Sequence, residues 1–135
     1  MKSKLSFPFL ILLSIIIIIA EVNAETDSLT QKKLSAVATV KLIEGIHSDV
    51  RGISRCCIYL AGKYKIREAL KPLISRLKEE QDPAQSILIA IVLYKIGDPR
   101  GIYEVDKLAL RDSDHHVRKV CKAIYDEYLA SLGLN

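Results

Sequence analysis

The stretch Tyr94–Gly101 reads YKIGDPRG, and it decides the fold of this chain of 135 residues. An apolar run reaches Ile96, and Gly97, Asp98 and Pro99 follow it directly. Glycine favours the left-handed conformation in which many helices end. An aspartate side chain can accept a hydrogen bond from a free N–H at a helix start, and proline fits the first helical position because its missing N–H would have no partner there. The stretch therefore predicts that one helix ends here and the next begins at once.

The same aspartate–proline pair occurs at Asp82 and Pro83. Elsewhere apolar residues recur three and four positions apart, and the sequence contains no Asn-Gly or Asp-Gly hairpin signal. Pro72 is expected to kink the helix that contains it. The sequence predicts an all-α fold with helices at 28–46, 50–64, 67–80, 83–96, 99–111 and 114–131.

A repeat is visible when the chain is shifted by 32 residues. The shift aligns three helix starts, at Ile53, Gln85 and Val117. It also places Tyr64 and Tyr128 on the apolar Ile96, so both tyrosines are expected in the core. A fixed period of this size is typical of solenoids, in which about two and a half stacked helix pairs are near the lower limit for stability. The helix at 28–46 would cap the first pair.

Two segments resemble the short bacterial HEAT-like repeats, including those of phycobilisome lyases: YKIGDPRG at Tyr94–Gly101 and DHHVRKVCKAIYDEY at Asp114–Tyr128. The second helix of that family contains Pro-Leu, which Pro72 and Leu73 match. The resemblance covers about 45–135 and implies a short right-handed α-solenoid of HEAT-like helical hairpins. It also implies that the second helices carry the partner-binding face, and that Arg100 pairs with an acidic group of a neighbouring repeat.

The N-terminus has the layout of a secretory signal peptide. Lys2 and Lys4 precede an apolar run at Phe7–Ala20, and small residues follow at Val22–Ala24. We therefore expect a signal peptide at 1–24, a HEAT-like repeat domain at 25–135, and a periplasmic or extracellular protein without a membrane span after cleavage. An uncleaved anchor is the alternative. Cleavage lowers the formal net charge of +4 by one, and so small a charge does not favour nucleic acid as a partner.

The three cysteines are Cys56, Cys57 and Cys121. Cys57 and Cys121 lie two repeats apart, and helices pack about 8–10 Å apart, so their Cα atoms should be on the order of 20 Å from each other. A disulfide requires Cα atoms within about 7 Å. We therefore expect three largely buried thiols at the contact between helices. Reactive or metal-binding thiols are the alternative.

The densest polar cluster lies between two predicted helices and comprises Asp112, Asp114, His115 and His116. Metal ligands on one helix favour i, i+4 spacing, so we interpret this cluster as a solvated turn in which an aspartate caps the next helix. We predict no metal and no cofactor. The sequence has no H-E-x-x-H motif and no glycine-rich phosphate loop, and it indicates no catalytic residue.

Six residues are interpreted as structural turn and cap residues: Asp82, Pro83, Gly97, Asp98, Pro99 and Arg100. Six others form the expected partner-binding face on the second helices: Lys71, Ser75, Lys78, Tyr103, Lys107 and Arg111. Solenoids expose extended surfaces without needing a pocket, which favours a protein or peptide partner on this face. The alternative is an ordinary solvated helix face. The hypothesis is an exported, non-catalytic scaffold or adaptor. The alternatives are a lyase-like accessory protein that binds a chromophore or another ligand, and a module that forms a homodimer through its C-terminal helix.

Overall fold

The computed structural model of the protein describes residues 35–134. The chain divides into two units, Met1–Ala38 and Thr39–Asn135. In the first unit, residues 35–38 are helical and exposed. The expected signal peptide at 1–24 and the start of the helix expected at 28–46 lie outside the described residues.

The second unit consists of helices. Residues 39–46 are helical, and five α-helices follow them: α2 (Arg51–Lys63), α3 (Leu70–Glu79), α4 (Pro83–Ile96), α5 (Pro99–Arg111) and α6 (His115–Ser131). A short 3₁₀-helix, η1 (Arg67–Ala69), leads directly into α3. Residues 35–134 contain no strand, which confirms the predicted all-α class. Within this part of the chain, no helix combines the length and the apolar character that a membrane crossing requires.

The region around Pro72 differs from the expected kinked helix. The 3₁₀-helix ends at Ala69 and α3 begins at Leu70, so Pro72 lies in the first turn of α3. A proline there breaks no helical hydrogen bond, because the N–H groups of a first turn have no partner within the helix. The irregular backbone therefore precedes the helix and does not interrupt it.

Aspartate caps and prolines set the starts of α4 and α5. Asp82 and Asp98 each accept a hydrogen bond of 3.0 Å from a backbone N–H in the first turn of the helix that follows. Pro83 and Pro99 begin these two helices. Gly97 ends α4 with a φ of 74°, a left-handed conformation that glycine adopts without strain.

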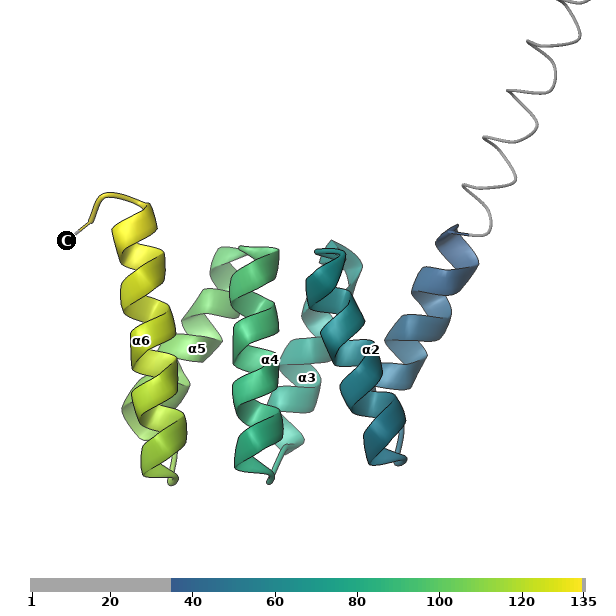
Figure 1. Ribbon diagram of the computed structural model, residues 1–135, viewed down its shortest axis with the longest axis horizontal. Coiled ribbons are helices and arrows are strands. Elements are labelled where there is room, and N and C mark those ends of the chain that lie inside the picture. Colours follow the sequence, from purple (N-terminus) through teal and green to yellow (C-terminus); the bar gives the residue numbers. More distant parts are fainter. Residues whose placement is uncertain (1–34, 135) are drawn as a thin grey trace, which may run out of the picture. The chain divides into compact units, whose positions relative to one another are not determined.

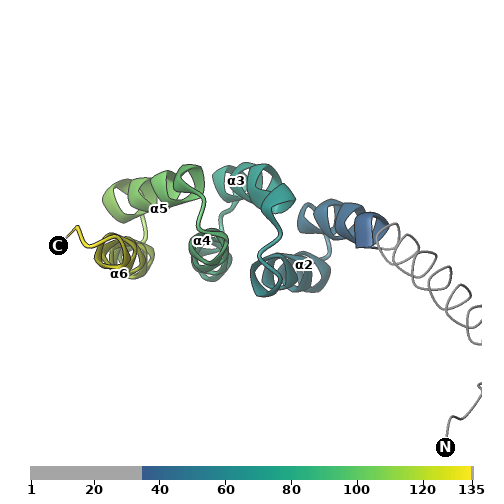
Figure 2. The same cartoon turned by 90° about the horizontal axis from the view of Figure 1, so that it is seen from above.

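The helices of the second unit form two layers. α2, α4 and α6 lie side by side in one layer, and α3 and α5 lie in the other (Figures 1 and 2). α4 packs against α2 and α6 on its two sides and against α3 and α5 from the second layer. Its sequence, PAQSILIAIVLYKI, is apolar almost all round because neighbours cover it on several sides.

Two glycines allow the helices to approach closely. A Cβ atom at Gly62 of α2 would lie 2.8 Å from Cγ2 of Val92 on α4. A Cβ atom at Gly101 of α5 would lie 3.1 Å from Leu93 and 3.2 Å from Leu70. A side chain would clash with Val92 at position 62 and would crowd the two leucines at position 101, and neither glycine lies at a turn.

A buried hydrogen-bond chain connects α2 to its neighbours. Ser54 Oγ donates to the carbonyl oxygen of Ile46 at 2.7 Å, and Gln85 Nε2 of α4 donates to Ser54 Oγ at 3.3 Å. Both polar side chains are buried. Buried polar groups are costly without partners, so this chain favours one alignment of α2 with α4 and with residues 39–46.

The expectation that Tyr64 belongs to the core is wrong. Tyr64 is 64% exposed, whereas Ile96, one repeat later, is 8% exposed. α4 has α2 beside it to cover the flank that carries Ile96, but α2 has no preceding helix of its own layer among the described residues. Tyr128, the third member of this set, is partly buried on α6.

Candidate functional site

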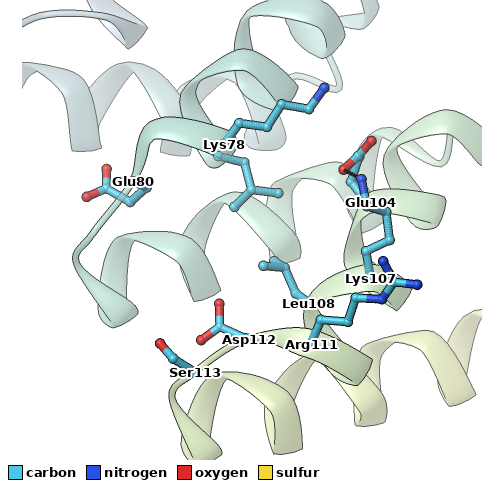
Figure 3. Close-up of a pocket in the computed structure, with 9 residues that line it drawn as sticks. Lys78, Glu80, Glu104, Lys107, Leu108, Arg111, Asp112 and Ser113 are labelled. Carbon is cyan, nitrogen blue, oxygen red and sulfur yellow. Dashed lines mark hydrogen bonds and ion pairs between the residues drawn. The ribbon is translucent and has the colours of Figure 1, made fainter.

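A groove of about 350 Å³ lies between α3 and α5. In Figure 3, Lys78 extends over it from α3, while Lys107 and Arg111 enter from α5. Glu80 and Asp112 lie at the opposite end, beside the turns that leave the two helices. The residues that line the groove are Leu77, Lys78, Glu80, Glu104, Lys107, Leu108, Arg111, Asp112 and Ser113.

The amphipathic sequences of α3 and α5 position these side chains. Leu77 is buried and Leu108 is partly buried against the core, so together they form an apolar floor. Glu104, Lys107 and Arg111 recur three and four positions apart on α5, which places them on one face of that helix. The charged face of α5 therefore borders an apolar surface.

The three basic residues of the groove differ in their partners. Lys107 Nζ lies 3.0 Å from Glu104 Oε2 and 5.5 Å from the centre of the Tyr103 ring. Lys78 and Arg111 are exposed and form no ion pair with any described residue. These two cations are thus free to meet an incoming anion.

The acidic end of the groove is occupied by the protein's own turns. Glu80 Oε1 accepts hydrogen bonds from the backbone N–H groups of Gln81 and Asp82 at 3.0 and 2.9 Å. Its other oxygen lies 3.1 Å from Arg76 Nη2. Asp112 Oδ1 likewise accepts a backbone N–H, at 2.8 Å. The two carboxylates stabilise the turns. Glu80 is paired with Arg76, so among the described residues only Asp112 leaves a negative charge without an ion pair at this end of the groove.

The structure separates the six residues of the expected partner-binding face. Lys78, Lys107 and Arg111 line the groove together. Lys71 and Ser75 are exposed on α3 but do not line it. The basic stripe expected from the sequence is therefore divided: Lys78, Lys107 and Arg111 line the groove, and Lys71 lies outside it.

Tyr103 also lies outside the groove. It is 63% exposed and lines a smaller cavity of about 190 Å³ between α5 and α6. Sequence reasoning did not identify the leucines of the groove floor, Leu77 and Leu108. Their place in the sequence was a signal that could have identified them, because Leu77 is adjacent to Lys78 and Leu108 is adjacent to Lys107.

The cysteines lie elsewhere, and the expectation of three buried thiols is wrong for Cys56. Cys56 is exposed, because no described helix covers its side of α2. Cys57 is partly buried: its Sγ lies where a side chain at Gly45 would be, and burial raises the pKa of its thiol. Cys121 is fully buried, which raises the pKa of its thiol to about 11. All three thiols are free.

The polar cluster between α5 and α6 is a capped turn. Asp114 Oδ1 accepts the backbone N–H groups of Val117 and His116 at 3.0 and 2.7 Å, and these bonds lower the pKa of its carboxyl group. Arg118 Nη1 donates to the carbonyl oxygen of Asp112 at 2.7 Å, so the arginine of the Val-Arg pair ties the turn to α6. Among residues 35–134, no group of three or more His, Cys, Asp or Glu side chains is placed to hold a metal ion.

Arg100 does not pair with an acidic group of a neighbouring repeat. Its Nε and Nη2 atoms each lie 2.9 Å from an oxygen of Asp98, in the same turn. The bidentate contact lowers the pKa of the Asp98 carboxyl group to about 2. The nearer partner prevails because Asp98 is two residues away and already fixed as a helix cap.

The groove can hold an acidic group beside an apolar side chain. Lys78 and Arg111 supply unpaired positive charge, and the leucine floor supplies apolar surface. Neither histidine nor cysteine is among the described residues that line it, so it does not pair a nucleophile with an imidazole base. Compared with protein-family models, with curated proteins and with solved structures, the chain gives no match.

Proposed function

We propose that this protein is an exported, non-catalytic scaffold or adaptor that binds a protein or peptide partner in the groove between α3 and α5. We further propose that residues 25–135 form a short right-handed α-solenoid of HEAT-like helical hairpins. The 32-residue repeat and the two helix layers support the solenoid, and the sequence of residues 1–24 supports export. Solenoids present extended surfaces to partners, which agrees with a binding role.

The observation that carries the proposal is the unpaired charge above an apolar floor. Lys78 and Arg111 come from different helices, yet both border the surface formed by Leu77 and Leu108. An ion pair formed next to apolar surface is partly shielded from water, so it is stronger than one on an open helix face. The groove thus combines an apolar contact with a charged one.

The two ends of the groove indicate the chemistry of the partner. A large apolar side chain would contact the leucine floor, and a neighbouring carboxylate would meet Lys78 and Arg111. Asp112 at the other end, which has no ion pair among the described residues, would repel a second carboxylate and attract a basic residue. We therefore propose a peptide segment with an acidic residue, a large apolar residue and a basic residue in this order or its reverse.

A displayed library of random peptides tests the proposal. Peptides retained by the full chain should be enriched in an acidic residue close to a large apolar one. The Kd of a selected peptide should rise about a hundredfold when Lys78→Glu and Arg111→Glu are combined, because a change of roughly 1.4 kcal/mol corresponds to a factor of ten.

The matched control reverses two other charges, with Arg55→Glu and Lys119→Glu. Both residues are exposed in the layer of α2 and α6 and lie outside the groove, and their reversal changes the net charge by the same amount. The control should bind the peptide as the unmodified chain does. Equal loss in the two double variants, or no enrichment of acidic residues, would contradict the proposal.

Self-association is a second candidate, favoured by an apolar groove of about 450 Å³ between α4 and α6. Ile91, Val120 and Ile124 line it, and Leu132 and Leu134 beyond it are 53% and 64% exposed. We propose a homodimer through the C-terminal helix in this case. Light scattering should then give a dimer mass that Ala123→Arg, an exposed position in the groove, reduces to that of the monomer. A monomer at every concentration would refute it.

A further inference from the structure

Lys65 has an unusual backbone conformation. Its φ of 49° is the one positive φ of a non-glycine residue between residues 35 and 134. The position one repeat later is Gly97, whose φ is 74°. Glycine adopts this conformation freely, whereas the Cβ atom of a lysine crowds the backbone. A strained residue at a position suited to glycine points to a role for its side chain.

Lys65 borders a cavity of about 530 Å³ at the point where the turn after α2 meets the C-terminal ends of α4 and α6. Two further basic residues, Arg67 and Lys95, line this basic cavity. Tyr94 and Tyr128 contribute to its walls. Its size falls in the range of about 300–1,000 Å³ that small-molecule sites occupy.

No carboxylate of the described residues is paired with the three basic side chains of the cavity, and only the partial negative charge at the C-terminal ends of α4 and α6 offsets their positive charge. Lys65, Arg67 and Lys95 form no ion pair with any residue in the described part of the chain. Arg67 contributes weakly to the lowered pKa of Asp98, but Arg100 already engages both oxygens of that carboxylate. Three like charges around one cavity repel one another, and a bound anion would relieve this repulsion.

The chemistry of the cavity indicates the class of anion. A guanidinium group and two ammonium groups match the three oxygens and the double charge of a phosphate better than a single carboxylate. The tyrosine rings offer a surface for an organic group. Glu68, the acidic residue nearest in sequence, is exposed and does not line the cavity. We propose that the basic cavity binds a phosphomonoester, with its phosphate held by the three basic residues and its organic part against the two tyrosines.

Titration of the full chain with phenyl phosphate, followed by calorimetry, tests this proposal. A parallel arm measures co-sedimentation with vesicles that contain phosphatidic acid, against vesicles of phosphatidylcholine alone. Saturable binding of phenyl phosphate would identify a soluble organic phosphate as the ligand. Binding only to the phosphatidic acid vesicles would identify a lipid headgroup. Either result supports the site if it depends on Lys65.

Lys65→Gly is the decisive variant because it should make the protein more stable and at the same time weaken phosphate binding. Removing the Cβ atom relieves the backbone and should raise Tm by a few degrees, while loss of the ammonium group should raise the Kd at least about tenfold. Lys65→Arg, which keeps the charge, should retain binding. Lys119→Met on α6, outside the cavity, should bind as the unmodified chain does.

The outcomes that would overturn the proposal are distinct. Absence of saturable binding in both arms would overturn it, and so would an unchanged Kd or unchanged vesicle binding in Lys65→Gly. The groove between α3 and α5 shares no lining residue with the basic cavity, so neither result bears on the proposed peptide binding.

Discussion

α2 and α6 occupy equivalent repeat positions on either side of α4, and they are buried on opposite flanks. The buried residues of α2 include Ser54, Ile58 and Ala61, whereas those of α6 are Val117 and Cys121. Shifted by two repeats, the two sets fall on different sides of the helix. Each helix is buried on the flank that its neighbours cover, although both occupy the same position in the repeat unit. Equivalence in sequence therefore does not imply equivalent burial.

The uncovered flanks of the two helices also differ in chemistry. On α6, Lys122 and Asp126 form an ion pair at positions equivalent to the buried Ile58 and Gly62 of α2. On α2 the uncovered flank is apolar, and Ile53 there is about half exposed. The uncovered flank of α6 is polar and therefore suited to contact with water. The uncovered flank of α2 is apolar and therefore suited to packing against another apolar surface.

Thiol reactivity should show the largest contrast between the two helices. Iodoacetamide should modify Cys56 of α2 in the native full chain at least about a hundredfold faster than Cys121 of α6, because Cys121 is fully buried and its pKa of about 11 leaves only roughly a thousandth of that thiol ionised at pH 8. Peptide mass mapping over time measures both rates. In denaturant all three cysteines should react alike, and similar native rates would disprove the burial of Cys121.

The close approach of α2 to α4 should give the largest change in stability. Gly62→Ala should lower the free energy of unfolding by about 1–3 kcal/mol, because the new methyl group would meet Val92. Gly52→Ala on the same helix meets nothing within 4 Å and should raise stability by up to about 1 kcal/mol. Chemical denaturation followed by circular dichroism measures both. Equal effects would show that packing does not require glycine at position 62.

Ser54 and Arg118 hold equivalent positions and both donate to the end of the preceding segment, so they can be compared directly. Ser54→Ala should cost about 1–3 kcal/mol, because it leaves buried groups of Ile46 and Gln85 without a partner. Arg118→Met should cost less, because water can reach the turn carbonyl that it leaves. Ser86→Ala is the control, since the Ser86 hydroxyl has no hydrogen bond among the described residues. A larger loss from Arg118→Met would reverse the comparison.

Helix capping should give the smallest effects. The N-cap of α2, Val50, has no side-chain hydrogen bond to its helix, so Val50→Ser should raise stability by about 0.5–1 kcal/mol. Asp114→Ala at the start of α6 should lower Tm at pH 7. Thermal unfolding followed by circular dichroism measures both variants.

The effect of Asp114→Ala should depend on pH. Folding lowers the pKa of Asp114, so its charged form stabilises the protein above the ordinary aspartate pKa of about 3.9. This contribution is lost as the pH falls through the lower pKa of the folded state. The Tm difference between the unmodified chain and Asp114→Ala should therefore shrink in acid. A constant difference between neutral pH and pH 2.5 would show that the charge of the cap does not matter.

Helix positions and helix starts were predictable from the sequence because their causes are local. The caps at Asp82 and Asp98 act on N–H groups two residues away, and Gly97 ends α4 through its own φ. The pairing of Arg100 with Asp98 is also local, whereas the resemblance to the repeat family implied a more distant acidic partner.

The candidate site was only partly predictable. Lys78, Lys107 and Arg111 were identified as one basic face, but the leucine floor beneath them was not. The groove exists only where two helices that are distant in sequence lie side by side. The positive φ of Lys65 was not predicted, although the 32-residue repeat aligns this lysine with Gly97, for which the sequence did indicate a left-handed conformation.

The sequence by itself determined that residues 35–134 are helical, where α4 and α5 begin and end, and which residues repeat every 32 positions, whereas the start of α3 at Leu70 was not predicted. These properties depend on interactions within a few residues of the backbone. Only the tertiary structure decided that Cys56 and Tyr64 are exposed, that Cys121 is buried, and that basic residues from separate segments share a cavity. Whether a side chain is buried, and which side chains meet in one cavity, depends on the neighbouring helix that covers each helix face. A periodic sequence pattern repeats the same helix face but does not specify which helix covers it.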